Sequence, residues 1–192
     1  SHSKTSSKVI AEQFVHRENY RFLVLGDKVI AVARRKSAHV IGDGKSNIKQ
    51  LIEQTNTIRK NSLLKPILVD NEVNLKLQRD GRSFDTIPQE GEQVILRYNC
   101  NLTTGGTTEE CMSEVCDYYK EQAIKAVKVT DAEFGGVDII AQNISSPGEF
   151  AINEINYNPG LRLHYKVDKG NVTDVAVPIM QYIRDKYINL QK

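Results

Sequence analysis

The chain has 192 residues, of which 40% are apolar and 26% are charged, an ordinary balance for a protein with a buried core. Its net charge of +2 creates no general attraction to nucleic acid or to anionic membranes. No apolar run approaches the roughly 18 residues of a membrane span. We therefore expect a soluble, cytoplasmic protein with no nucleic-acid or membrane partner.

The N-terminus and the cysteines give little indication of chemistry. The first residues, SHSKTSSK, are polar and lack the apolar core of a signal peptide. We expect a disordered or tag-derived leader over residues 1–8 and one domain over residues 9–192. Cys100, Cys111 and Cys116 share one segment, without a histidine or a further cysteine at zinc spacing. Reduced, structural thiols are therefore favoured over a metal site.

Residues 9–35 are rich in β-branched and aromatic side chains and predict strands. Gly26-Asp27 separates two such runs and is typical of a two-residue hairpin turn. The pairs predicted for this hairpin are Leu25 with Lys28, Arg21 with Val32 and Asn19 with Arg34.

The middle of the chain alternates turns with short elements. The sequence Gly42-Asp43-Gly44 predicts a tight turn, and Ser46 is a suitable N-cap for the helix that follows. That helix places Ile48, Leu51 and Ile52 on one face. The later segments are predicted to be a short helix near residues 73–78, a strand over residues 92–99 and a loop over residues 100–110.

The C-terminal half predicts an amphipathic helix, a hairpin and a closing helix. The helix over residues 115–129 turns inward Val115, Tyr119, Ala123, Ala126 and Val127. The hairpin spans residues 137–157. The closing helix, residues 173–190, has on one face Ala176, Ile179, Met180, Ile183 and Tyr187. Strands joined as hairpins and mixed with helices favour an α+β fold, a mostly antiparallel sheet with helices on one side.

The hairpin of residues 137–157 brings two acids together. With the turn centred near Ser146, the facing pairs are Ile140 with Ile152, Asp138 with Glu154 and Gly136 with Asn156. Opposite residues project from the same face with Cβ atoms about 5 Å apart. Asp138, Glu154 and Asn156 would therefore form one set of oxygen donors, beside the space that Gly136 leaves.

Two facing carboxylates repel each other unless something lies between them. Three oxygen donors without histidine or cysteine suit Mg²⁺ or Mn²⁺, so this face could hold the metal of a bound nucleotide. A shared proton, giving an acid/base pair, is a second interpretation. A register shifted by one residue, which would leave both acids as solvated charges, is the third.

Other polar residues point to phosphate only weakly. The loop TTGGTT, residues 103–108, offers bare backbone N–H groups and hydroxyls, the materials of an anion nest. Arg21, Arg97 and Arg162 stand in or beside strands or turns, where a guanidinium can bind phosphate or carboxylate. Surface ion pairs are the simpler interpretation of each arginine. His39 and His164 lack a neighbouring nucleophile in the sequence, which favours packing roles.

Three motifs occur in a specific order: RRKSAHVIGDG, NLTTGG and EINYNPGLRLH. The pair VDIIA and INEINYNPG resembles the metal-binding end of the ATP-grasp superfamily, with an Asp on one strand and Glu-x-Asn on the next. The ordered set looks like the ATP-grasp region of cyanophycin synthetases. It is also similar to the glutathione synthetase half of bifunctional bacterial glutathione-forming enzymes. The likeness covers about residues 9–188.

The resemblance implies an ATP-dependent carboxylate–amine ligase that forms an acyl phosphate, using ATP, Mg²⁺ or Mn²⁺, and an amino-acid or peptide substrate. Each implied role falls on matching positions. The implied metal ligands are Asp138, Glu154 and Asn156, and the implied nucleotide contacts are Glu12, Gln13, Val15 and Asn19. The implied catalytic contacts to phosphate or acyl phosphate are Arg21 and Arg97. The implied acceptor-site residues are Asn99, Asn101, Gly105, Gly106 and Arg162.

The sequence departs from the family pattern at Gln13, where many relatives have Lys, and at Asn19, where they have an acid. The family also places a small lobe, with a lysine and a Gly-rich loop, before this segment. Residues 9–192 therefore look like the C-terminal lobe alone, with that N-terminal lobe or another copy of the chain as a partner. A cyanophycin synthetase-type ligase is the first interpretation. A glutathione synthetase-like ligase is the second, and a non-catalytic nucleotide-binding or assembly module is the third.

Overall fold

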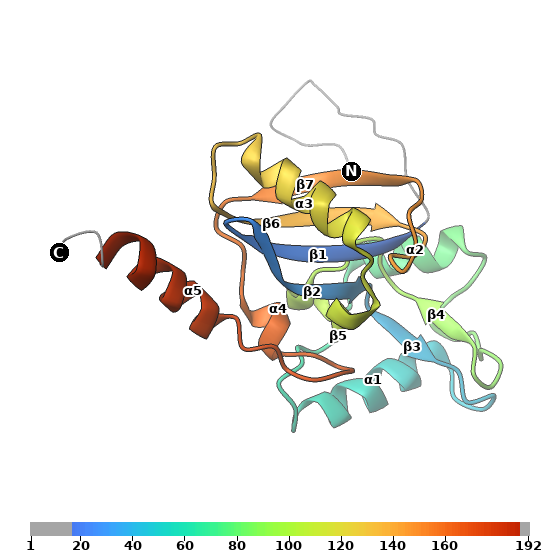
Figure 1. Ribbon diagram of the computed structural model, residues 1–192. Coiled ribbons are helices and arrows are strands. Elements are labelled where there is room, and N and C mark those ends of the chain that lie inside the picture. The colour runs from blue at the N-terminus through green and yellow to red at the C-terminus, as the bar shows by residue number, and fades with distance from the viewer. Residues whose placement is uncertain (1–16, 189–192) are drawn as a thin grey trace, which may run out of the picture.

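A five-stranded antiparallel sheet forms the centre of the protein. The computed structural model describes residues 17–188 (Figure 1), so the leader and the strand predicted over residues 9–16 lie outside the described part. The sheet order is β5-β2-β1-β6-β7, which confirms the predicted mostly antiparallel α+β class. The strands are β1 (Glu18–Leu25), β2 (Lys28–Lys36), β5 (Thr107–Glu110), β6 (Phe134–Ala141) and β7 (Phe150–Asn156).

The helix α3 (Asp117–Lys128) covers one face of this sheet (Figure 1). Tyr119, Ala123 and Val127 recur at helical spacing and share a hydrophobic cluster with Phe22 and Val137 of the sheet. The inward face predicted for this helix is thereby confirmed. Its first predicted member, Val115, is buried too, but it precedes α3 and follows the short turn η2 (Met112–Glu114).

A second, smaller core lies beside the sheet. The strands β3 (His39–Ile41) and β4 (Gln93–Ile95) pair with each other and pack with α1 (Ile48–Arg59) and α2 (Asn71–Arg79). The predicted helix near residues 73–78 is confirmed as part of α2. The strand predicted over residues 92–99 is wrong beyond Ile95, because Arg97 and Asn99 leave the ladder and bind carboxylates of the α2 N-terminus.

The helix α1 begins at a capping box, one residue after the predicted N-cap. The Asn47 side chain accepts a hydrogen bond from the Gln50 backbone N–H at 2.9 Å, and the Gln50 side chain accepts one from the Asn47 N–H at 2.9 Å. The hydroxyl of Ser46 instead donates to Asp43 in the preceding turn. The two reciprocal bonds explain why Asn47 is the cap.

Asn47→Ala should lower the free energy of unfolding by about 1 kcal/mol, because the Gln50 backbone N–H loses the side-chain oxygen that accepts its hydrogen bond. Chemical denaturation measures this change. Ser46→Ala is the matched control and should cost less than about 0.5 kcal/mol. A larger loss for Ser46→Ala than for Asn47→Ala would contradict the assignment of the cap.

The opposite face of the sheet is apolar at one end only. Leu23 and Ala31 form a small cluster there with Val175, close to α4 (Arg162–Tyr165) and α5 (Ala176–Ile183). The π-helical turn η3 (Arg184–Ile188) follows α5. The other end of this face, which we call the polar end of the sheet, carries charged and amide side chains that are described with the candidate site.

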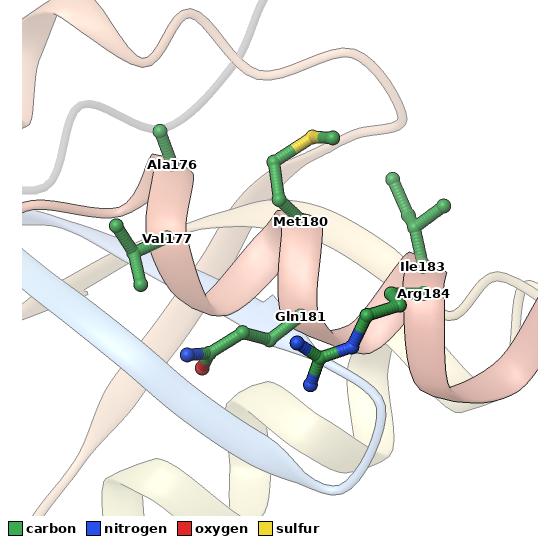
Figure 2. Close-up of a pocket in the computed structure, with 6 residues that line it drawn as sticks. All are labelled: Ala176, Val177, Met180, Gln181, Ile183 and Arg184. Atoms are coloured by element: carbon green, nitrogen blue, oxygen red, sulfur yellow. The ribbon is translucent and has the colours of Figure 1, made fainter.

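The helix α5 runs outward from the body instead of lying across the sheet (Figure 1). In Figure 2, Ala176, Met180 and Ile183 project from one side of it, and Val177, Gln181 and Arg184 from the other. The face predicted for a closing helix is therefore largely exposed, with Met180 62% and Tyr187 53% accessible. Ile179 alone of that face packs on the cluster of Leu23, and residues 189–190 lie outside the described part. Among the helices of residues 17–188, none has the length and apolar character to cross a bilayer.

Two β-bulges decide which side chains share a face. In the β1–β2 hairpin, Leu25 faces Lys28 as predicted, but the register shifts between Leu23 and Val24. The extra residue in β2 reverses the faces of the residues beyond it. The pairs predicted for Arg21 and Asn19 are therefore wrong, and the structure has instead Arg21 with Ala33 and Asn19 with Arg35.

The second bulge follows Asp138 in the β6–β7 hairpin. Asp138 faces Glu154, whereas Ile139 faces Ile152, so Asn153 is the extra residue. The predicted pair of Ile140 with Ile152 is wrong for this reason, and Ile140 faces Ala151. The bulge keeps Ile155 and Phe150 against the α3 cluster while Glu154 stays opposite Asp138.

Candidate functional site

Asp138 lies at the centre of the polar end of the sheet. It is 2% exposed, and β-sheet pairing places it between Arg21 of β1 and Glu154 of β7. The predicted pairing of Asp138 with Glu154 is confirmed. The alternative register, with both acids on an exposed edge, is wrong because Asp138 is buried.

Two guanidinium groups hold the Asp138 carboxylate. Arg21 donates through Nε to Oδ1 and through Nη2 to Oδ2, the second bond being 2.9 Å long. Arg35 donates through Nη1 to Oδ2 at 2.8 Å. These charge-assisted bonds compensate the buried carboxylate, so the structure gives no support for a proton shared with Glu154. Arg35 was missed by sequence reasoning, because the β1–β2 bulge turns it, and not Arg34, to this face.

Glu154 and Asn156 complete the set of oxygen donors predicted for this face. The Glu154 side chain is exposed, and Asn156 is half-buried. In the orientation that satisfies both of its atoms, the Asn156 amide donates to Glu154 Oε1 at 3.2 Å and accepts from Arg21 Nη2 at 3.3 Å. Two carboxylates and an amide oxygen are a suitable donor set for Mg²⁺ or Mn²⁺, whose other ligands are phosphate oxygens and water.

Gly136 makes room for this arrangement. It faces Asn156 as predicted, and a Cβ atom at this position would lie 2.7 Å from Pro159 Cβ and 3.1 Å from Arg21 Cδ and Nη1. The glycine therefore allows Pro159 to close over the sheet beside the Arg21 guanidinium.

The loop of residues 101–106 reaches the site through Asn101. Arg35 Nη2 donates to Asn101 Oδ1 at 3.2 Å. The predicted anion nest is wrong in this structure, because Asn101 and Leu102 carbonyls accept the N–H groups of Thr104, Gly105 and Gly106 around the turn η1 (Leu102–Thr104). Gly106 serves close packing, since a Cβ there would lie 2.8 Å from the Asn101 and Lys36 carbonyl oxygens.

Arg97 and Asn99 belong to a second polar cluster. The Arg97 guanidinium, 1% exposed, binds Asp70 at 2.7 Å and also Glu72. The Asn99 amide donates to Glu72 at 3.0 Å. Among the described residues, neither a hydrogen bond nor an ion pair joins Arg97 to Asp138. The predicted phosphate contact of Arg97 stays a prediction, and its present partners are at the N-terminus of α2.

The remaining predicted residues lie around the site or outside the described part. Asn19 lines a cleft of about 230 Å³ together with Arg35, Lys36 and Cys100, and its Oδ1 is buried without a partner among residues 17–188. Such an atom fits a contact with a ligand donor. Arg162 is exposed and begins α4. The predicted nucleotide contacts outside the described residues are Glu12, Gln13 and Val15.

Within the described part of the chain, the cysteines and the acids form no alternative metal centre. Cys100, Cys111 and Cys116 are free thiols, as predicted, and burial raises the pKa of Cys111 to about 12. Within residues 17–188, His, Cys, Asp and Glu form no group of three that could hold a metal ion. The donor set of the β6–β7 hairpin is consistent with that finding, because its third member, Asn156, is an amide.

His164 of α4 is buried, with 3% of its surface exposed. Burial, together with the positive charge of Arg21, lowers the pKa of His164 to about 4. Its Nε2 has no partner among the described residues. The imidazole is therefore neutral near pH 7 and contributes packing, as predicted.

His164 should make the stability depend on pH. Because its pKa is lower in the folded state than the 6.5 of a free imidazole, the unfolded chain takes up the proton first, and stability falls as the pH falls from about 6.5 towards 4. The loss attributable to His164 is at most about 3 kcal/mol. Urea denaturation at several pH values should show a shallower slope for His164→Leu than for the wild type. Parallel curves would contradict this assignment.

The antiparallel sheet carries two acids, an amide and two arginines on one face, and comparison with known proteins identifies the family. The chain belongs to the RimK-like ATP-grasp domain family, whose model matches residues 26–183.

Curated relatives include glutathione biosynthesis bifunctional proteins and cyanophycin synthetases. Over 93% of this chain, the sequence is 38% identical to the bifunctional protein of Listeria monocytogenes. Over 92% of this chain, it is 40% identical to that of Listeria innocua. It is 34% identical to the cyanophycin synthetase of Crocosphaera subtropica over 94%. The chain spans about a quarter of the length of these relatives, 24%, 24% and 22% respectively.

A solved structure agrees with the sequence relatives. The bifunctional glutathione synthetase from Pasteurella multocida matches with a TM-score of 0.71 and 27% identity, over 92% of this chain and 25% of that one.

Proposed function

We propose that this chain is the C-terminal lobe of an ATP-grasp domain in an ATP-dependent carboxylate–amine ligase. The observation that carries the proposal is the polar end of the sheet, where Asp138, Glu154 and Asn156 share one face with Arg21 and Arg35. Family membership supports the same reaction class. Such ligases phosphorylate a carboxylate with ATP, and an amine then attacks the acyl phosphate.

The residues of the polar end fit the first half of that reaction. Asp138, Glu154 and Asn156 would hold Mg²⁺ or Mn²⁺, which supplies positive charge to the phosphate oxygens. Arg21 and Arg35 lie beside these donors, and a guanidinium can bind a phosphoryl group through two bonds. Positioning and charge compensation by preorganised groups are the main sources of rate in such a transfer.

The remaining roles follow the positions of the side chains. Asn19 would contact the nucleoside from the cleft beside Arg35, together with Glu12, Gln13 and Val15. Asn101 binds Arg35 and would mark the start of the acceptor site, which we extend to Asn99, Gly105, Gly106 and Arg162. Arg97 would need to exchange a carboxylate partner before it could bind an acyl phosphate.

Two substrate types remain candidates. Identities of 38–40% to glutathione biosynthesis bifunctional proteins, against 34% to a cyanophycin synthetase, favour a glutathione synthetase-like ligase. The segment NPGLRLH favours a cyanophycin synthetase-type ligase, the first interpretation from the sequence. Both types join an amino acid or peptide through an acyl phosphate.

Trapping with hydroxylamine tests the proposed reaction. The chain, or a longer protein that contains it, is incubated with ATP, Mg²⁺ and a panel of amino acids and short peptides. ATP-dependent hydroxamate formation with one of these carboxylates is the expected result. ATP binding without hydroxamate from any of them, in the longer protein, would favour a non-catalytic nucleotide-binding or assembly module.

A further inference from the structure

Arg35 donates to Oδ2 of Asp138, an oxygen that also accepts a hydrogen bond from Arg21. We propose that Arg35 exchanges partners when ligands enter: a nucleotide phosphate takes its guanidinium from Asp138, and Oδ2 of Asp138, which keeps its bond from Arg21 Nη2, then accepts a divalent cation in place of Arg35. This inference rests on the proposed nucleotide function. It adds that the nucleotide phosphate enters before the metal ion, in an order that Arg35 sets.

The charges at the polar end explain why a cation alone would bind weakly. Asp138 and Glu154 contribute two negative charges, and Arg21 and Arg35 contribute two positive ones. Asp138, the buried acid, has both guanidiniums as partners, while Glu154 is exposed to water. A metal that enters alone must therefore displace a charged partner or bind mainly to a solvated carboxylate, where attraction is small.

The two arginines differ in how firmly they hold Asp138. Arg21 lies directly opposite on the adjacent strand and donates two hydrogen bonds. Its side chain is confined where Gly136 lacks a Cβ atom. Arg35 comes from β2, which does not pair with β6, and donates one bond to Asp138 and another to Asn101. Arg35 is therefore the partner that can leave at the smaller cost.

The cleft beside Arg35 gives a phosphate access to its guanidinium. Arg35 lines this cleft of about 230 Å³ with Asn19 and Lys36. A guanidinium binds phosphate as well as carboxylate, through the same parallel N–H groups. The exchange keeps every charge paired, because Arg35 gains the phosphate as Asp138 gains the cation.

One substitution tests the exchange, because it should change two affinities in opposite directions. Arg35→Met removes one of the two guanidiniums that hold Asp138, so Mn²⁺ alone, followed by its paramagnetic resonance signal, should bind about tenfold more tightly than to the wild type. ATP in the presence of EDTA should bind about tenfold more weakly, because its phosphate loses Arg35. A merely structural role would weaken both ligands together.

Arg34→Met is the matched control. Arg34 is the adjacent residue of β2, faces the other side of the sheet and pairs with Glu109. It should leave both affinities at the wild-type values, with thermal melts verifying that both variants are folded. Unchanged or weaker Mn²⁺ binding by folded Arg35→Met, with ATP binding intact, would overturn the exchange alone. Failure of the wild type to bind ATP, in EDTA and with Mg²⁺ alike, would overturn the proposed nucleotide function.

Discussion

Asp138→Asn should lower the free energy of unfolding by about 3 kcal/mol, the usual cost of removing one partner from a buried ion pair. The substitution keeps the shape of the side chain but leaves Arg21 and Arg35 without their shared carboxylate. Urea denaturation measures the loss. The same change at the facing acid, Glu154→Gln, should cost less than about 0.5 kcal/mol, because Glu154 is exposed.

A double variant separates the buried charge from other effects of the asparagine. Adding Arg35→Met to Asp138→Asn removes one of the two unpaired cations, so it should restore part of the lost stability. Equal stability of the wild type and Asp138→Asn would show that the two guanidiniums do not depend on this carboxylate, and the account of the polar end would fail.

Gly136→Ala should cost about 2 kcal/mol and loosen the site, since the new Cβ would lie 2.7 Å from Pro159 Cβ and 3.1 Å from the Arg21 side chain. Pro159 or Arg21 must shift, and a shift of Arg21 disturbs its bonds to Asp138. Thermal unfolding and ATP affinity both report the change. Gly160→Ala is the control, because nothing lies within 4 Å of its added Cβ; similar losses in both variants would contradict the close approach at Gly136.

The central pair of acids could be predicted from the sequence, and one of its arginines could not. A turn centred near Ser146 pairs Asp138 with Glu154, but the same register fails at Ile140, and the acids face each other only because Asn153 is an extra residue in β7. The face of Arg35 depends on the bulge between Leu23 and Val24, and one extra residue in a strand has no clear signature when its neighbours are all apolar.

The loops and the last helix show the limits of local patterns. The glycines of residues 105–106 suggested free N–H groups, whereas the folded turn uses those groups itself. The apolar face of α5 suggested burial, but burial depends on what lies beside a helix and not on its own periodicity. The pairing of Asp138 with Glu154 was therefore predicted correctly, whereas the pairs that a bulge displaces and the neighbours of the loop and of α5 were not.

Calorimetric titration with ATP, with and without Mg²⁺, tests the central claim most directly when wild type is compared with Glu154→Gln. Glu154 is exposed, so the variant should remain folded, which circular dichroism verifies. We predict that Mg²⁺ tightens ATP binding by about tenfold or more in the wild type and has little effect in Glu154→Gln. An equal effect of Mg²⁺ in both proteins would contradict a metal–nucleotide site on the β6–β7 hairpin.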